Sequence, residues 1–323
     1  MNRRYFCTLF DRNYLFKGVA MLESLAEHCP AAQVFVLCMD DVTYQLLAKL
    51  AYPHVERVRL ADVEDDALLA VKPGRGVAEY CWTLTSSLSW HIFRTRPEVG
   101  QLTYLDADLL FFAPVEPLFE EIGEASIAII EHRFIPRLQA YAINGRFNVE
   151  WVSFRRDEQG LACLARWREQ CIEWCFNRLE DGRMGDQKYL DEWPERYSSV
   201  CIIQHPGAGV APWNYANYGI GSGPGGITVE GAPLIFYHFH QLQMHRYGRF
   251  DYMANLYPVE KPPPAAIYAA YERALTAALQ KVRMHEPTFA YGIQPLMPWL
   301  IRRFIQNYLP RGLKSLLKRV VHT

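Results

Sequence analysis

The sequence has no long apolar run, no excess of one charge and no cysteine arrangement typical of a metal site. Without about 18 consecutive apolar residues, no membrane-spanning helix is expected. The 34 basic and 35 acidic side chains give a formal net charge of −1, so no nucleic-acid partner is expected. Among the eight cysteines, Cys171 and Cys175 are spaced i, i+4 but lack a second pair for zinc. We therefore expect buried free thiols in a protein of the reducing cytoplasm.

Strand-like and helical patterns alternate along the first half of the chain. Half of the 323 residues are hydrophobic, enough to bury a large core. The apolar run at 5–10 is too short for a signal peptide and is expected to be a strand. Further strands are expected at 34–39, 55–60, 102–106 and 126–130, and helices at 15–28, 43–51 and 84–95. This order predicts an α/β fold with a mostly parallel sheet, in which ligands bind at the carboxyl ends of strands.

The second half of the chain is rich in aromatic residues and loops. The glycine cluster at 219–226 lacks the strand and helix that flank a phosphate-binding loop, so a flexible loop is expected. The proline-rich stretch 258–264 is typical of a linker. We therefore predict a main domain at 1–257, the linker, and a helical C-terminal extension at 265–323 that begins with a strong helix pattern.

The tail at 299–321 sets apolar residues at i, i+3 and i+4. Its six cations have no acid beside them: Arg302, Arg303, Arg311, Lys314, Lys318 and Arg319. A basic amphipathic segment of this kind binds an anionic membrane surface, with its cations near the headgroups. A helix packed on the main domain with a solvated basic face is the alternative.

Two carboxylates, Asp106 and Asp108, interrupt an otherwise apolar, strand-prone run at 103–112. In an extended segment, residues two apart point the same way. Burying two like charges is costly unless a cation or hydrogen-bond donors satisfy them. The pair therefore predicts a divalent metal that holds a phosphorylated substrate. The alternative is a strand end with solvated acids.

The first strand also ends in polar residues that suit a nucleotide. Thr8 and Asp11 lie in or directly after this strand, followed by Asn13 and Tyr14. A carboxylate and an amide there can contact a base edge and a ribose, although such residues commonly end strands. Asp40, after the second strand, is expected to be an ordinary helix cap.

Two later segments offer amide and carboxylate groups. Asn148, near the start of an alternating strand at 147–154, is either a substrate-binding amide or a turn residue. Gly185 precedes Asp186 and Gln187, which can bind sugar hydroxyls or stabilise a developing cation. The alternative for Asp186 is a plain helix N-cap.

Histidines supply the remaining candidate ligand. His238 and His240 point the same way at the end of an apolar strand at 234–241, and either would complete a mixed nitrogen and oxygen site that suits manganese. His205 is a rival for that role.

Together these segments resemble a GT-A fold glycosyltransferase, most similar to glycosyltransferase family 8 and related bacterial lipopolysaccharide and capsule enzymes. The resemblance covers residues 4–245. It lies in the metal motif at 104–108, the nucleotide loop at 11–14, the Phe-Asn strand at 147–148, the donor-sugar segment at 185–187 and the His-Phe element at 238–239. The chain departs from the family pattern at Glu150 and Gln241, where glycine is usual, and at Ala211, where lysine is usual.

The resemblance implies a GT-A, Rossmann-like catalytic domain that transfers a sugar with retention of configuration. It implies Mn²⁺ or Mg²⁺ on Asp106, Asp108 and His238, with His240 and His205 as alternatives, and catalytic roles for Asp186 and Gln187. A nucleotide-sugar donor, preferably a UDP-sugar, would contact Thr8, Asp11, Asn13, Tyr14, Ala107, Asn148 and Gly185. The acceptor would be a glycan or a lipid-linked glycan, used in bacterial surface polysaccharide or lipopolysaccharide synthesis on the cytoplasmic face of the inner membrane.

Two other functions remain open at this level. A sugar-phosphate nucleotidyltransferase shares the α/β core, but it would carry a glycine-rich loop after the first strand, and residues 10–14 contain no glycine. A non-catalytic nucleotide-sugar-binding protein of the same fold is the other alternative. The acidic pair, Gly185–Gln187 and the histidines together argue against it.

Overall fold

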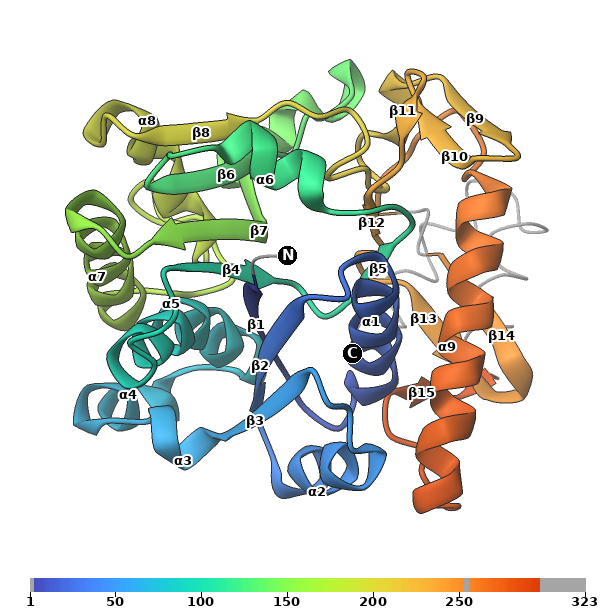
Figure 1. The fold of residues 1–323 in the computed structure, drawn as a ribbon, viewed down its shortest axis with the longest axis horizontal. Coiled ribbons are helices and arrows are strands. Elements are labelled where there is room, and N and C mark those ends of the chain that lie inside the picture. Colours follow the sequence, from blue (N-terminus) through green and yellow to red (C-terminus); the bar gives the residue numbers. More distant parts are fainter. Residues whose placement is uncertain (1–2, 253–255, 297–323) are drawn as a thin grey trace, which may run out of the picture.

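A seven-stranded sheet runs through the centre of the molecule (Figure 1). The computed structural model describes residues 3–252 and 256–296. The strand order is β3 (Val55–Arg59), β2 (Ala32–Cys38), β1 (Arg4–Phe10), β4 (Gln101–Leu105), β7 (Phe147–Arg155), β6 (Ile127–Glu131) and β8 (Val200–Ile203). Neighbouring strands are parallel except that β7 is antiparallel to both β4 and β6. The predicted α/β fold with a mostly parallel sheet is confirmed.

Helices cover both faces of this sheet, which explains why β2 and β6 are hydrophobic along almost their whole length. One buried cluster includes α1 (Leu15–His28), α2 (Asp41–Leu50), α6 (Glu116–Ile122) and α9 (Ala265–His285). The other includes α3 (Leu60–Val63), α4 (Asp66–Val71), α5 (Val77–Thr95), α7 (Glu158–Glu173) and α8 (Trp193–Arg196). Asp40 caps α2, as expected, because its side chain accepts the Thr43 N–H at 2.8 Å.

Three small sheets lie beside the central one (Figure 1). They pair β5 (Leu109–Phe111) with β12 (Phe236–His238), β9 (Ile220–Gly223) with β10 (Gly226–Val229) and β11 (Ala232–Pro233), and β13 (Gln243–His245) with β14 (Arg249–Asp251) and β15 (Ile293–Gln294). The flexible loop expected at 219–226 is therefore wrong, because most of it forms the β9–β10 hairpin. Gly226 has φ +103°, which glycine adopts without strain, and this lets the chain reverse.

Residues 256–296 pack on the core. The carbonyl of Lys261, in the stretch predicted to be a linker, accepts the Tyr215 hydroxyl at 2.5 Å. Tyr271 and Leu275 of α9 are buried in the same cluster as α1 and α2. The predicted membrane-binding tail at 299–321 lies outside the described residues. Within the described ranges, no helix combines the length and hydrophobicity that crossing a membrane requires.

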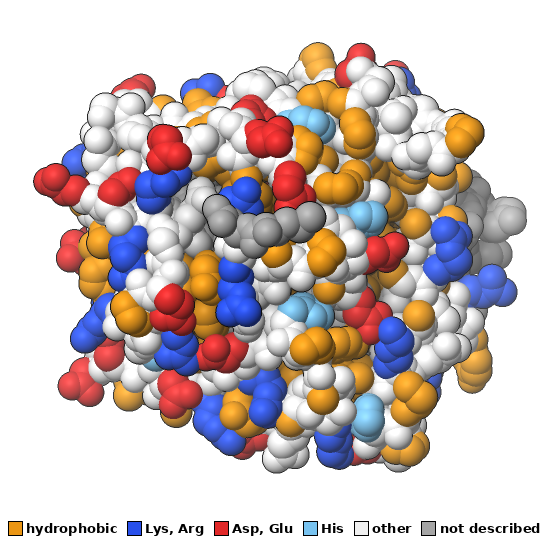
Figure 2. Space-filling view, viewed as in Figure 1, with side chains coloured by type: hydrophobic (Ala, Val, Ile, Leu, Met, Phe, Trp, Pro, Cys, Tyr) orange, Lys and Arg blue, Asp and Glu red, His pale blue; other side chains and the backbone are white. Residues whose placement is uncertain are grey.

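Basic and acidic side chains are interspersed over the face shown in Figure 2. Basic and acidic side chains of the described residues also form ion pairs, such as Lys188 with Asp191 at 2.8 Å and Lys281 with Glu23 at 2.7 Å. Ion pairs near the surface each contribute about 0–1 kcal/mol, so they stabilise the fold only slightly. The distribution agrees with the near-zero net charge of the sequence.

Candidate active site

A cavity of about 710 Å³ opens at the carboxyl ends of β1 and β4, where parallel α/β sheets bind their ligands. Most of the residues singled out in the sequence line it: Asp11, Asn13, Tyr14, Asp106, Ala107, Asp108, Asn148, Gly185, Asp186, Gln187, His238 and His240. Thr8 does not line it, because its side chain is fully buried within β1. His205 also lies outside the lining, and its Nδ1 accepts the Gly207 N–H at 3.1 Å.

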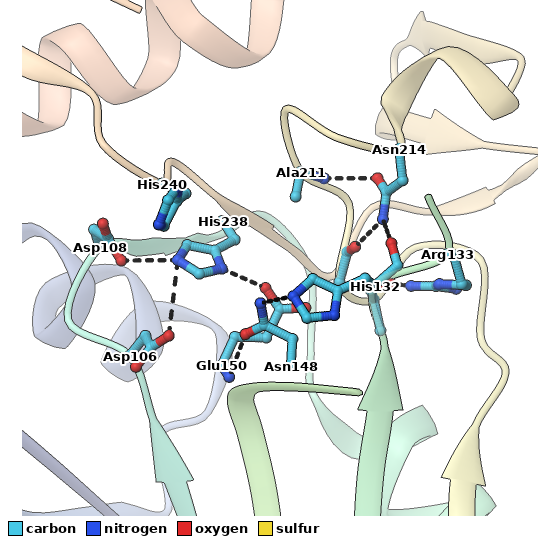
Figure 3. Close-up of polar contacts among 12 residues, drawn as sticks. Asp106, Asp108, His132, Arg133, Asn148, Glu150, Ala211, Asn214, His238 and His240 are labelled. Carbon is cyan, nitrogen blue, oxygen red and sulfur yellow. Dashed lines mark hydrogen bonds and ion pairs between the residues drawn. The ribbon is translucent and has the colours of Figure 1, made fainter. Parts of the chain in front are cut away.

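Asp106, Asp108 and His238 converge at one end of the cavity (Figure 3). The His238 Nε2 atom lies 3.1 Å from Asp108 Oδ1 and 3.8 Å from Asp106 Oδ2. Strand pairing explains the approach, because His238 of β12 is opposite Leu109 of β5, the residue after Asp108. The Phe239 N–H also donates to the Asp108 carbonyl at 3.0 Å.

This donor set fits a divalent cation. One ligand atom from each of the three side chains lies within 4.8 Å of the others. Two carboxylates and one imidazole are the ligands that manganese accepts, and magnesium accepts the carboxylates. Neither His240 nor His205 belongs to this group, although His240 lies close by, with its ring centroid 5.6 Å from that of His238.

A third acid, Glu150 of β7, lies behind His238. Its Oε2 atom is 2.6 Å from His238 Nδ1, and its side chain is completely buried. Burial lowers the pKa of His238, but Asp108 and Glu150 outweigh this effect and raise that pKa well above its usual value. Burial would also raise the pKa of Asp108, yet His238 holds it below the usual range. Sequence reasoning noted Glu150 only as a departure from a family pattern and missed this contact.

The cavity itself is strongly acidic. Asp11, Asp106, Asp108 and Asp186 line it, whereas no lysine or arginine does so among the residues that the structure describes. The lining also includes His238, whose pKa is raised well above its usual value. Lys17 of α1 lies close by, with its ammonium group 4.2 Å from the centre of the Tyr14 ring, but it is buried, and this burial lowers its pKa. The excess of acids favours an anionic ligand that enters together with a cation.

The loop after β1 has a fixed shape. The Asp11 carboxylate accepts the Asn13 N–H at 2.9 Å and its side-chain amide at 2.6 Å. The chain after α9 supports this loop from behind, because a Cβ atom on Gly292 would lie 1.9 Å from the Asn13 carbonyl oxygen. The Arg12 guanidinium also lies 5.2 Å from the centre of the Tyr291 ring. The loop thus presents Asn13 and Tyr14 to the cavity from a rigid base.

Asp186 and Gln187 line the cavity at the start of a 3₁₀ helix, Gln187–Glu192. Asp186 occupies the N-cap position of this helix, as the alternative expected, but its side chain makes no capping hydrogen bond. Burial, followed by the charge of Asp106, raises the pKa of Asp186 to about 7. Gln187 donates its Nε2 atom to the Asn144 carbonyl at 2.9 Å, which orients its amide.

Asn148 is not a turn residue, because it lies within β7. Its Oδ1 atom accepts the Glu150 N–H at 2.7 Å, and its Nδ2 atom lies 2.9 Å from His132 Nε2. His132 Nδ1 lies 3.2 Å from the Arg146 carbonyl, which can only accept. The Nδ1 atom of His132 is therefore the donor, and its Nε2 accepts from Asn148. Asn148 thus borders the cavity while linking two buried residues.

An aromatic wall closes the cavity beyond His238, and sequence reasoning did not find it. Trp213 is almost completely buried and meets the rings of His238 and His240 edge-on, at centroid distances of 5.2 and 5.7 Å. The Tyr257 hydroxyl lies 3.0 Å from His240 Nδ1. Asn214 holds the Trp213 loop in place by donating to the His132 carbonyl at 2.9 Å.

Comparison with known proteins finds two relatives in sequence and a solved structure with a similar fold. No protein-family model matches the chain. The uncharacterized protein YfnD of Bacillus subtilis (strain 168) is 33% identical over 299 residues, covering 91% of this chain and 96% of YfnD. The uncharacterized protein YfnF of the same organism is 32% identical over 292 residues, covering 88% and 95%. The solved galactosyltransferase LgtC, in complex with donor and acceptor sugar analogues, is 14% identical with a TM-score of 0.52, covering 85% of this chain and 95% of LgtC.

Proposed function

This chain belongs to the family of Bacillus subtilis YfnD and YfnF and has the GT-A glycosyltransferase fold, and we propose that it is a metal-dependent glycosyltransferase. In this proposal a sugar passes from a nucleoside diphosphate donor, preferably a UDP-sugar, to a saccharide or lipid-linked glycan. The solved LgtC complex held donor and acceptor sugar analogues, which supports one cavity for both substrates.

The observation that carries the proposal is the convergence of Asp106, Asp108 and His238 in a cavity whose described lining contains no lysine or arginine. A nucleoside diphosphate brings several negative charges, and the ionised aspartates of the cavity would repel them. A bound Mn²⁺ or Mg²⁺ would neutralise the charge that develops on the departing diphosphate. The three side chains would hold that ion, with His238 contributing its Nε2 atom.

The donor nucleoside is proposed to lie at the loop after β1. Tyr14 offers a ring that is 37% exposed, and Asn13 offers an amide whose position is fixed by Asp11. An aromatic face and an oriented amide suit a flat base with polar edges. Ala107 lies between the two acids and is small, so the backbone there can approach the diphosphate.

The reacting sugar is proposed to face Asp186 and Gln187. Charge becomes positive at the anomeric carbon during transfer, and a carboxylate or an amide oxygen close to that carbon lowers the barrier. Gln187 donates its nitrogen to the Asn144 carbonyl, so its Oε1 atom is the part of the amide left for the sugar. The proposal includes retention of configuration, with the leaving phosphate taking the acceptor proton.

The acceptor is proposed to be a lipid-linked glycan of bacterial surface polysaccharide or lipopolysaccharide synthesis, on the cytoplasmic face of the inner membrane. The basic amphipathic pattern at 299–321 supports this part. A lipid-linked acceptor requires the enzyme to work beside a membrane surface.

A donor screen tests the proposal. Purified protein is incubated with a panel of nucleotide sugars and Mn²⁺, and release of nucleoside diphosphate is measured with and without EDTA. We expect release from one donor class, stopped by EDTA and by Asp106→Ala. Release of pyrophosphate from a sugar phosphate and a nucleoside triphosphate would instead indicate a nucleotidyltransferase. Tight donor binding without turnover would indicate a non-catalytic binder.

A further inference from the structure

Glu150 is an unusual residue to find inside a protein. Its side chain is fully buried in β7, and only one of its two carboxylate oxygens has a hydrogen-bond partner within the described ranges. A buried carboxylate with an unsatisfied oxygen costs free energy. Among the described residues, the side-chain hydrogen-bond partner of this carboxylate is His238 Nδ1, at 2.6 Å. Because Glu150 costs folding free energy and contacts a candidate metal ligand, we expect its function to lie in that contact with His238.

We propose that Glu150 is a positioning residue that accepts the Nδ1–H of His238 and thereby fixes the ring with Nε2 directed at Asp106 and Asp108. An imidazole can carry its proton on either nitrogen, and only the nitrogen without a proton can bind a metal. Metal-binding histidines commonly donate their other N–H to a carboxylate, which sets the ring orientation and increases the basicity of the ligand. This inference rests on the metal site of the proposed function.

The surroundings of Glu150 hold its carboxylate in this place. Asn148 Oδ1 accepts the Glu150 N–H at 2.7 Å, and Asn148 is in turn bound to His132 (Figure 3). Trp213 also meets the His238 ring edge-on, with an interplanar angle of 85°. The imidazole is therefore held by a hydrogen bond at Nδ1 and by packing, which leaves Nε2 as the atom directed toward the two aspartates.

The loop that contains Gly209 leaves room for the Glu150 side chain. A Cβ atom on Gly209 would lie 2.7 Å from Glu150 Oε1 and 2.5 Å from Ile130 Cδ1. Gly209 also has φ +64°, which disfavours other residues. Two distant parts of the chain thus fit each other: an acid on β7 and a glycine where a larger side chain would displace that acid.

Two substitutions separate positioning from simple packing. Glu150→Met keeps a side chain of similar volume but accepts no hydrogen bond from His238. Glu150→Gln keeps the shape and an amide oxygen that can accept the Nδ1–H. If Glu150 positions His238, we expect Met to weaken Mn²⁺ binding about 10- to 100-fold and Gln to restore most of the affinity. If it only fills space, Met binds Mn²⁺ like the wild type, and the inference is overturned.

Mn²⁺ affinity is measured by isothermal titration calorimetry on the full chain. Circular dichroism and thermal melting check that each variant is folded. Glu23→Gln is the matched control. Glu23 lies on α1, outside the cavity lining, and is a partly buried acid that accepts a hydrogen bond from the Tyr52 hydroxyl. It should bind Mn²⁺ like the wild type.

A spectroscopic readout reports the ring directly. With ¹⁵N-labelled histidine and Zn²⁺ as a diamagnetic probe, the His238 Nδ1 signal of the wild type should be that of a protonated nitrogen. Glu150→Met should lose this single tautomer, whereas Gln should retain it. An unchanged spectrum in the Met variant would overturn the inference. If neither the wild type nor Asp106→Ala binds Mn²⁺, the proposed metal site itself fails, which is a different outcome.

Discussion

Two single residues of the site, Asp106 and Asp186, are acids whose burial opposes their ionisation. Burial is the main cause that raises both pKa values to about 7, and the charge of Asp106 adds to the effect at Asp186. An aspartate in an unfolded chain titrates near 4. The folded protein therefore holds these two protons more tightly than the unfolded chain. This contribution to stability is complete below about pH 4 and is lost as the pH rises to about 7.

We therefore expect the metal-free protein to lose stability between about pH 4 and 7, and Asp186→Asn to reduce this loss because its amide carries no ionisable proton. Urea unfolding midpoints in EDTA at pH 5 and pH 8 measure the effect. Asp66→Asn, on an exposed turn of α4, is the control and should keep the wild-type pH dependence. Equal pH dependence in Asp186→Asn and wild type would show that Asp186 ionises normally.

Replacing the histidines one at a time tests the third ligand. His238→Ala should raise the Mn²⁺ concentration needed for half-maximal transfer at least roughly tenfold, since it removes a nitrogen ligand. His240→Ala should have a smaller effect through the aromatic wall. His205→Ala should leave the requirement unchanged, because His205 lies outside the cavity lining. Metal dependence altered only by His205→Ala would refute the assignment of His238.

Gln187 offers a separate test on the sugar side. Gln187→Ala should lower the turnover rate at least roughly tenfold, which corresponds to about 1.4 kcal/mol of lost transition-state stabilisation. Single-turnover kinetics at saturating donor measure this step. Lys188→Ala is the neighbouring control, because Lys188 pairs with Asp191 and does not line the cavity. Equal rates in both variants would remove Gln187 from the chemistry.

Among the structural elements, β12 is the strand that brings His238 to the acidic pair. The Phe236 ring of β12 stacks on Trp151 of β7, with a centroid distance of 5.6 Å and an interplanar angle of 8°. Phe236 also pairs with Phe111 of β5 in the strand register. The position of the candidate metal ligand thus depends on an aromatic contact in the core.

Phe236→Ala should lower the free energy of unfolding by about 3–5 kcal/mol and also weaken Mn²⁺ binding, because β12 loses its packing. Urea unfolding and Mn²⁺ titration of the folded variant measure the two effects. Phe119→Ala removes a ring of the same cluster from α6 and should destabilise the fold without changing the Mn²⁺ affinity. If both variants bind Mn²⁺ like the wild type, β12 packing does not control the site.

Local sequence patterns predicted the positions of the helices and strands better than the contacts between distant segments. Hydrophobic runs gave β1, β2 and β4 to within a few residues, because buried strands are marked by their own side chains. The Asp106 and Asp108 pair was visible for the same reason. The role of Glu150 was not, since it depends on how β7 lies against β12, and these strands do not pair with each other. The wall around Trp213 likewise depends on contacts between distant loops.

For the molecule as a whole, membrane binding by the segment 299–321 can be tested. Its basic amphipathic pattern predicts binding to anionic membranes, which salt should weaken. In liposome flotation at low salt, the full chain should float with anionic vesicles, and a chain truncated after residue 296 should not. The same two proteins should both stay unbound with neutral vesicles. Equal flotation of the two proteins with anionic vesicles would assign any membrane binding to residues before 297.

The contact of Gly292 with the loop after β1 has a consequence for synthesis on the ribosome. Translation delivers Arg12 and Asn13 long before Tyr291 and Gly292, which support them. Chains begin to fold from the amino end as they are made. A nascent chain therefore exposes the loop after β1 and the acidic pair before β12, α9 and residues 286–296 exist. The loop gains its support only when Tyr291 and Gly292 have left the ribosome and docked.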